Sequence, residues 1–282
     1  MGWTGDGGGE RESAVRFGEP VAFRVAGPRR CLGVWRGGRR SGCPGWADVP
    51  VRGTRAQCAQ CAGIDRAQSV AADTIADDPR PYHVYLAWFG DGWVKVGITG
   101  VRRGGARLLE QGAVAFTWLG QGPLMAARRA EELLRVALGV PDRIPYETKR
   151  IVRAAAAAGL DSGRARAELE RAHGVAVGLD GWPESLARLP CAVVGHGEAF
   201  GLGAVDGVDA VVSGLGEGAV VAGRVVAAAG PDLHLVEAGG RRLVVDTRVL
   251  AGWPLAGAGD GAAGAGAAVE VREVPAVQGG LF

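Results

Sequence analysis

Residues 82–99, YHVYLAWFGDGWVKVGIT, contain two runs of alternating character joined by Gly90-Asp91-Gly92. Alternation of this kind is typical of β-strands, and the glycine-rich joint predicts a hairpin. With a three-residue loop, Tyr85 lies opposite Gly97 and the apolar side chains all share one face. A two-residue turn would mix apolar and polar residues on both faces. Burial of one apolar face therefore selects the three-residue register.

The other face of this hairpin is our first candidate site. It carries four polar side chains and one glycine, namely His83, Tyr85, Lys95, Thr99 and Gly97. Directly opposed side chains in a sheet lie about 5 Å apart, so these residues should form one cluster, with room for a ligand beside the tyrosine ring. The alternative is an ordinary solvated face of a sheet.

Four of the five cysteines lie close together in the N-terminal part of the chain. Cys31 with Cys43, and Cys58 with Cys61, could supply the four sulfurs of a tetrahedral zinc site if the chain between Cys31 and Cys43 forms a hairpin. A redox pair at Cys58 and Cys61, or four unliganded thiols, are the alternatives. Cys191 lies in a distant apolar run and is expected in the core.

The cysteine segment is also basic. From Arg29 to Arg66 there are eight arginines against Asp48 and Asp65, although the net charge of the whole chain is only +2. A basic patch attracts polyanions such as nucleic acid, and a solvated arginine-rich surface is the alternative. Because the chain contains only two lysines, its abundance of arginine reflects a general bias in composition and is not by itself an argument for nucleic-acid binding.

The segments after the hairpin extend the order of elements to β-β-α-β-α. Residues 105–112 predict a short helix, residues 113–120 a third strand, and residues 123–139 a longer amphipathic helix. Glu131 falls within the apolar stripe of the longer helix, where a carboxylate needs a partner or a cation. A position at the rim of the stripe, bridged to an arginine, is the alternative.

This order, with the segments HVYLAWF, KVGIT, RLLEQG and AARRAEELL, resembles the GIY-YIG nuclease superfamily. The fuller plan, with a four-cysteine module ahead of the core, resembles an uncharacterised bacterial family of unknown function in that superfamily. The resemblance covers residues 82–139 and, more loosely, residues 14–190. It implies an α+β fold with a β-β-α-β-α core, a zinc-ribbon-like module before it and a small β-rich module after it.

The resemblance also implies roles for individual residues. Tyr85 matches the tyrosine of the first motif, and Gly97 and Thr99 match the glycine of the second motif and the hydroxyl residue that often follows it. Arg107 matches the arginine of the first helix, which would stabilise charge on the phosphate. Glu131 matches the glutamate that would hold Mg²⁺ or Mn²⁺.

Two positions depart from the motifs of the superfamily. His83 stands where the first motif has glycine, and Lys95 stands where the second motif has tyrosine. We include both among the catalytic candidates, with Tyr85 helping to deprotonate the nucleophile. Arg102 and Arg103, together with the motif residues of the second strand, are expected to bind substrate.

The remaining chain predicts two more helices within residues 144–174 and short β-rich runs from about residue 191. We therefore expect a flexible N-terminus at 1–13, a basic four-cysteine zinc-ribbon-like module at 14–78 and a GIY-YIG-like domain with added helices at 79–190. A small β-rich module should follow at 191–282, with a flexible Gly/Ala linker at 256–268.

These features predict a metal-dependent endonuclease or nucleic-acid-processing protein with one structural zinc, a catalytic Mg²⁺ or Mn²⁺ and DNA or RNA as its partner. A catalytically inactive nucleic-acid-binding protein on the same fold and a zinc-stabilised protein-interaction scaffold are the alternatives. No apolar run approaches the length needed to span a bilayer, and the N-terminus lacks the apolar core of a secretory signal. We therefore expect a cytoplasmic protein without a membrane partner.

Overall fold

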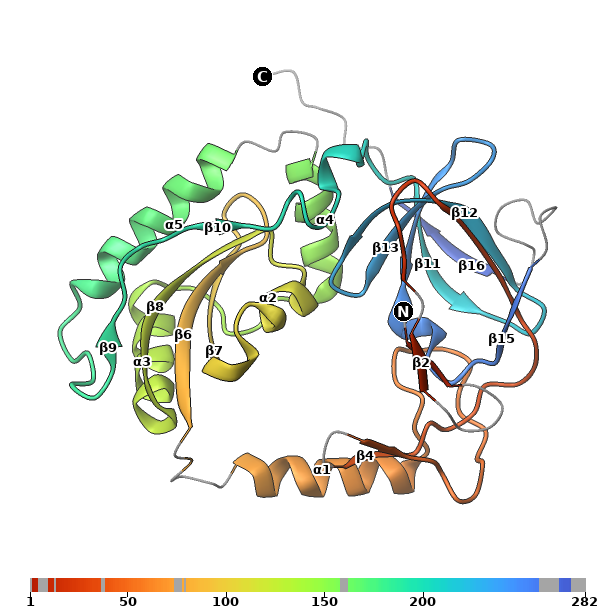
Figure 1. The fold of residues 1–282 in the computed structure, drawn as a ribbon, viewed down its shortest axis with the longest axis horizontal. Coiled ribbons are helices and arrows are strands. Elements are labelled where there is room, and N and C mark those ends of the chain that lie inside the picture. The colour runs from red at the N-terminus through yellow and green to blue at the C-terminus, as the bar shows by residue number, and fades with distance from the viewer. Residues whose placement is uncertain are drawn as a thin grey trace.

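The computed structural model describes residues 2–4, 10–12, 14–36, 39–73, 78, 80–157, 162–258 and 269–274. The protein has a mixed α+β fold with two main sheets, which lie on either side of helix α4 (Tyr146–Ala157) in Figure 1. No helix in these ranges is long and apolar enough to cross a membrane.

The first sheet is antiparallel and contains the predicted hairpin. In sheet order its strands are β10 (Val194–Gly195), β8 (Ala115–Pro123), β6 (Pro81–Trp88) and β7 (Val94–Gly100), with β9 (Ala187–Arg188) also paired to β8. Tyr85 lies opposite Gly97, so the predicted register is confirmed. Along the chain, β6, β7, α2 (Ala106–Gln111), β8 and α3 (Leu124–Ala137) follow the predicted β-β-α-β-α order.

Both faces of this sheet are covered. On the predicted apolar face, Val84, Leu86 and Val96 are fully buried beneath α3 and α5 (Ser162–Val177). On the other face, the side chains of Tyr85 and Ala87 of β6 pack in one cluster with Leu108 of α2 and with Ile144. The second face is therefore largely closed by protein and is not an ordinary solvated surface.

The second sheet has seven strands, which come from both the N-terminal and the C-terminal parts of the chain. In order these are β15 (Leu255–Gly257), β3 (Pro20–Val25), β12 (Val220–Ala229), β13 (Asp232–Val236), β14 (Arg242–Asp246), β11 (Ala210–Leu215) and β16 (Val269–Glu273). β3 comes from residues that we expected in the cysteine module. Likewise β10, expected in the C-terminal module, pairs with β8. Strands from different expected modules thus pair with each other in the same sheet.

Two segments that we expected to be flexible are only partly described. Within residues 1–13, β1 (Gly2–Thr4) pairs with β2 (Glu10–Glu12). The expected Gly/Ala linker at 256–268 begins in β15, which pairs with β3, and its residues 259–268 lie outside the described ranges.

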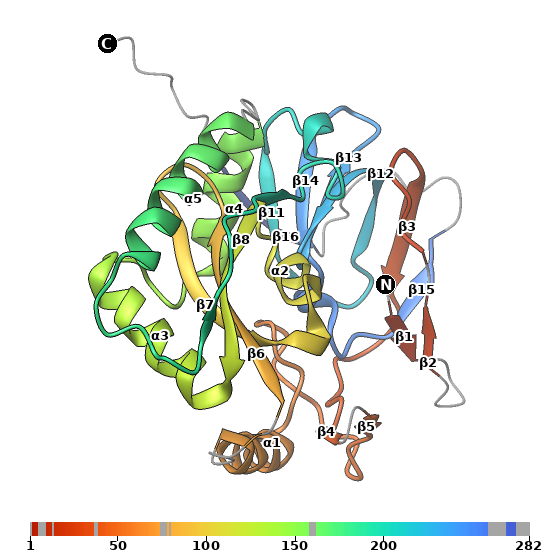
Figure 2. The same ribbon diagram turned by 60° about the vertical axis from the view of Figure 1, so that its left-hand side comes forward.

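The cysteine segment forms a separate lobe. Figure 2 shows its hairpin, β4 (Val34–Arg36) with β5 (Arg39–Ser41), beside helix α1 (Ala59–Asp73) and below both sheets. The side chain of Arg29 is almost fully buried and anchors this lobe. It donates hydrogen bonds to the carbonyls of Pro50 and Gly53 within the lobe, and to that of Ala251 next to the seven-stranded sheet.

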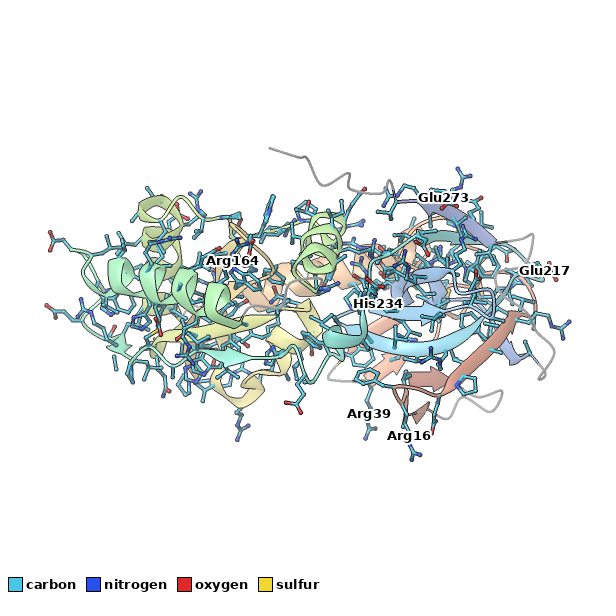
Figure 3. The ribbon with its side chains drawn as sticks, turned by 90° about the horizontal axis from the view of Figure 1, so that it is seen from above. Arg16, Arg39, Arg164, Glu217, His234 and Glu273 are labelled. Carbon is cyan, nitrogen blue, oxygen red and sulfur yellow. The ribbon has the colours of Figure 1, made fainter. Side chains whose placement is uncertain are left out.

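A buried ion cluster joins α4 to the seven-stranded sheet. Arg150 donates to Asp232 at 2.5 Å and to Asp246 at 3.0 Å. Arg153 donates to the other oxygen of Asp232 and, at 3.0 Å, to the carbonyl of Gly112 at the end of α2. The side chains of Arg153 and Asp232 have no exposed surface. In Figure 3, His234, which lies on the same strand β13 as Asp232, is beside this junction.

We expect Asp232→Asn to lower the free energy of unfolding by about 3–5 kcal/mol, because it leaves two buried arginines without their shared anion. Glu110→Gln is the matched control, since Glu110 pairs with Arg103 on the surface, and such pairs contribute at most about 1 kcal/mol. Urea unfolding followed by circular dichroism measures both. Equal losses in the two variants would contradict a special role for the buried cluster.

Candidate functional site

A pocket of about 380 Å³ lies at the β7 edge of the five-stranded sheet. It is lined by side chains from β6, β7, α2, α3, α4 and the loop before α4. The polar lining residues are Tyr85, Lys95, Arg107, Gln111, Glu131, Asp142, Arg143, Tyr146 and Lys149. Four of the five predicted catalytic residues are in this set, and Gly97 lies beside them.

Tyr85 fills the space that Gly97 leaves. A Cβ atom at Gly97 would lie 2.4 Å from the Tyr85 hydroxyl oxygen, so only glycine fits opposite this ring. Gln111 Nε2 donates to the hydroxyl at 3.0 Å, and Tyr85 is only 1% exposed. The room expected for a ligand is therefore occupied by the tyrosine ring itself. Burial raises the pKa of Tyr85, so the hydroxyl keeps its proton near neutral pH.

Lys95 connects β7 to the loop that follows α3. Its Nζ donates to the backbone carbonyl of Asp142 at 2.8 Å, and the side chain is buried. Burial lowers the pKa of Lys95. Lys95 thus ties β7 to the loop at Asp142, which forms one wall of the pocket.

Glu131 and Arg107 reach the pocket from two different helices. Burial raises the pKa of Glu131, and the charge of Lys95 opposes that shift. Within the described ranges, no hydrogen bond or ion pair within 4 Å holds the Glu131 carboxylate. The Arg107 side chain is more exposed than that of Glu131, and its Nη1 atom lies 3.7 Å from Oε2 of Glu110. A carboxylate and a guanidinium are therefore available at the same pocket.

Lys149 is a nearly fully buried lysine whose amine lies near two aromatic rings of the pocket region. It is 3% exposed, and its Nζ lies 4.2 Å from the ring centre of Phe89 and 4.8 Å from that of Tyr146. Burial, reinforced by the charge of Lys95, lowers the pKa of Lys149 to about 7. This amine can therefore be either protonated or neutral under physiological conditions.

Sequence reasoning did not identify Gln111, Asp142, Arg143 and Lys149 as pocket residues. The rarity of lysine was the one available signal for Lys149. The sequence around Lys149 predicts only an added helix beside the sheet, so it does not place this lysine at the pocket. The other three lie in a helix end and a loop, where no periodicity predicts which way a side chain points.

Four predicted site residues do not line the pocket. His83 stacks on Trp118 with ring centres 4.4 Å apart, and Thr99 is buried opposite it. Arg102 and Arg103 are exposed on the short 3-10 helix η1 (Val101–Arg103). Their catalytic or substrate-binding roles stay predictions.

The four N-terminal cysteines form a second candidate site. The sulfurs of Cys31, Cys43, Cys58 and Cys61 all lie within 4.8 Å of one another. Four thiolates about 2.3 Å from a central zinc would be roughly 3.8 Å apart, so this cluster could hold one zinc ion. The predicted hairpin between the first two cysteines is confirmed by β4 and β5.

Local hydrogen bonding and burial shift the pKa values of these thiols in opposite directions. The backbone N–H groups of Gly33 and Cys58 donate to the Cys31 sulfur at 3.4 and 3.2 Å. A backbone hydrogen bond from Ala47 lowers the pKa of Cys43 to about 7, whereas burial raises the pKa of Cys61 to about 12. A central cation would favour the thiolate form of all four. Our expectation that Cys191 lies in the core is wrong, because its side chain is exposed.

Both candidate sites fall within the part of the chain that a protein family covers. No match was found among curated proteins or among solved structures. One family model matches residues 18–255, which include the cysteine cluster and the whole lining of the pocket. The chain therefore belongs to the family described as protein of unknown function (DUF2797).

Proposed function

We propose that this protein binds nucleic acid and hydrolyses its phosphodiester bonds in the pocket at the β7 edge, on a core of the GIY-YIG type. One observation carries the proposal. Tyr85, Lys95, Arg107 and Glu131, which come from β6, β7, α2 and α3, line a single pocket. Each of them corresponds to a motif position of the superfamily, and the elements that carry them occur in the β-β-α-β-α order.

The charge of the pocket suits a phosphate group. Four basic side chains line it against two carboxylates, namely Lys95, Arg107, Arg143 and Lys149 against Glu131 and Asp142. A concave site with an excess of positive charge attracts the nucleic-acid backbone. The planar fork of Arg107 can contact two phosphate oxygens at once, and its charge gains importance as negative charge builds up in the transition state.

The carboxylates of the pocket suit a divalent cation. Glu131 is partly buried without a partner among the described residues, and Asp142 lines the same pocket. Mg²⁺ is commonly held by one or two carboxylates, with water and substrate phosphate completing its shell. Glu131 and Asp142 would hold this ion, which would supply positive charge at the phosphoryl oxygen. Tyr85, which is buried and hydrogen-bonded to Gln111, would support the floor of the pocket without touching the substrate.

The cysteine lobe offers a second surface for nucleic acid. Trp46 is 74% exposed and Trp35 54% exposed, and the Arg40 guanidinium lies 5.9 Å from the Trp35 ring centre. Exposed aromatic rings beside arginines are typical of surfaces that stack unpaired bases. We propose that a zinc ion bound by the four cysteines stabilises this lobe. Reduced thiolates around a metal fit a reducing compartment, so we propose a cytoplasmic location.

Binding without cleavage is a second candidate function. Its specific support is the burial of Tyr85, because a tyrosine that is 1% exposed and hydrogen-bonded to Gln111 is poorly placed to deprotonate a nucleophile. The basic pocket would then hold a phosphate group without activating water.

We expect Glu131→Gln to reduce Mg²⁺-dependent cleavage of nucleic acid by at least about 100-fold, because a metal ligand acts mainly on the transition state. Binding should change by less than about threefold, since the positive charges remain. The assay uses single-stranded, duplex and branched DNA and RNA with Mg²⁺ or Mn²⁺, and a gel shift in EDTA measures binding.

Glu132→Gln is the matched control for this experiment. Glu132 follows Glu131 on α3, but its side chain is 64% exposed and pairs with Arg135 outside the pocket. The control should keep wild-type activity within about twofold. Full activity in Glu131→Gln would refute the proposed metal site. Binding without cleavage by the wild type on every substrate would establish the second candidate function.

We expect the purified protein to contain about one zinc per chain, measured by inductively coupled plasma mass spectrometry. Cys58→Ser should release most of the metal on dialysis against a chelator and speed hydrogen exchange in α1 and β4, with β6–β8 unchanged. Cys191→Ser is the control and should keep its zinc, because Cys191 is exposed and does not belong to the cluster. Reduced wild-type protein free of zinc would disprove the site.

A further inference from the structure

The chain uses lysine at only two positions, and both lysines line the same pocket. Of its 32 basic residues, all but Lys95 and Lys149 are arginines. The two are far apart in sequence and come from different elements, β7 and α4. Arginine stays protonated in proteins, whereas a buried lysine can lose its proton. A pocket that contains the only two lysines therefore has cations whose charge can change.

The two amines have different surroundings. The Lys95 Nζ is fixed by a 2.8 Å hydrogen bond to the Asp142 carbonyl. The Lys149 Nζ lies between two aromatic rings and has one distant carbonyl neighbour, that of Gln111, at 3.5 Å. Only Lys149 thus lacks a close acceptor that would hold its protons in place.

The charges around Lys149 also favour the neutral amine. The positive neighbours that lower its pKa to about 7, after the effect of burial, are Lys95 on β7, Arg153 on α4, Arg107 on α2 and Arg248 on η3 (Thr247–Leu250). The other charged residues of the pocket are Arg143, Asp142 and Glu131. Cations outnumber carboxylates on the elements that face Lys149.

We propose that Lys149 is the proton acceptor that activates the attacking water in the hydrolysis. This assignment rests on the proposed function, because it names the base of that reaction. In the step, the neutral Lys149 amine takes one proton from water as the water oxygen forms a bond to phosphorus. The P–O bond to the leaving sugar oxygen breaks, and that oxygen takes a proton from solvent. Lys149 then returns its proton to solvent, so one water is consumed per bond cleaved.

The other pocket residues are less suited to this role. Tyr85 holds its proton because burial raises its pKa, and its hydroxyl is covered by Gln111. Arg107 cannot act as a base near neutral pH. His83 lies outside the pocket, stacked on Trp118. Lys95 is fixed by its hydrogen bond to the Asp142 carbonyl, and Glu131 and Asp142 are assigned to the divalent cation. Lys149 is therefore the pocket amine best suited to accept a proton.

The position of Lys149 is set by its own helix. The next residue, Arg150, and Arg153 one turn further on both donate to Asp232. The buried ion cluster therefore holds α4 in place, and Lys149, one turn before Arg153 on the same helix, lines the pocket. Such a rigid support is what a proton-transfer group requires.

The first test is a titration of the wild-type protein labelled with ¹³C-lysine. Because the chain has two lysines, the ¹³Cε–¹Hε spectrum should show two signals, which Lys149→Arg and Lys95→Arg assign. We expect the Lys149 signal to titrate near pH 7, far below the value of about 10.4 of an ordinary lysine. A Lys149 signal that titrates near pH 10 would overturn the proposal, whether or not the protein cleaves nucleic acid.

The second test is the pH dependence of kcat/KM for cleavage. With a neutral amine as base, wild-type kcat/KM should rise tenfold per pH unit below about pH 7 and level off above it. Lys149→Arg keeps a cation but cannot accept a proton, so it should lose at least about 100-fold at pH 8 and lose the rise near pH 7. Glu147→Gln, on the exposed side of the same helix, is the control and should keep the wild-type profile.

The outcomes separate the two proposals. Cleavage by Lys149→Arg with wild-type rate and pH profile, in a variant whose melting temperature is unchanged, would show that Lys149 only attracts phosphate and would overturn its role as base. Absence of cleavage by the wild type would overturn the proposed reaction, and with it the need for a base. If Lys149→Arg does not fold, the wild-type titration and Lys149→Met decide the question.

Discussion

The buried ion cluster beneath α4 determines how the two sheets of this protein meet. Arg150 and Arg153 are removed from water, and that desolvation is offset only while Asp232 and Asp246 stand opposite them. The aspartates belong to the seven-stranded sheet and the arginines to a helix that closes the pocket of the other sheet. One wall of the pocket is thus held by a sheet that contributes no residue to its lining. At the same junction Gly230, with a φ of 61°, lies so close to α2 that a Cβ atom would come within 2.9 Å of its backbone.

Part of the fold could be predicted from the sequence because it depends on local periodicity. The register of the hairpin with Tyr85 opposite Gly97 follows from the need to bury one apolar face, and the order β-β-α-β-α follows from successive patterns of period two and 3.6. The hairpin that brings Cys43 back to Cys31 follows from the requirement that four sulfurs meet. Each of these inferences uses residues that are near neighbours along the chain or joined by one turn.

The rest could not be predicted because it depends on which distant surfaces meet. Nothing near β3 indicates that it pairs with β12, and nothing in α4 shows that Lys149 faces Lys95. The orientation of the Tyr85 ring over Gly97 is likewise a matter of packing, since the same register is compatible with a ring that points to solvent. The composition did contain a usable clue. In a chain where almost every basic residue is arginine, the rare lysines mark a place where the chemistry of an amine matters.

The pairing of β3 with β12 has a consequence for synthesis on the ribosome. Arg24 lies opposite Val220, so β3 leaves the ribosome long before its partner strand has been made. At elongation rates of about 5–20 residues per second, the interval is roughly 10–40 s. During that time the cysteine lobe and the five-stranded sheet can form from residues already translated, whereas β3 remains an open strand edge. Until β12 has been made, β3 therefore has no long partner strand of its own and can pair with a strand of a neighbouring chain.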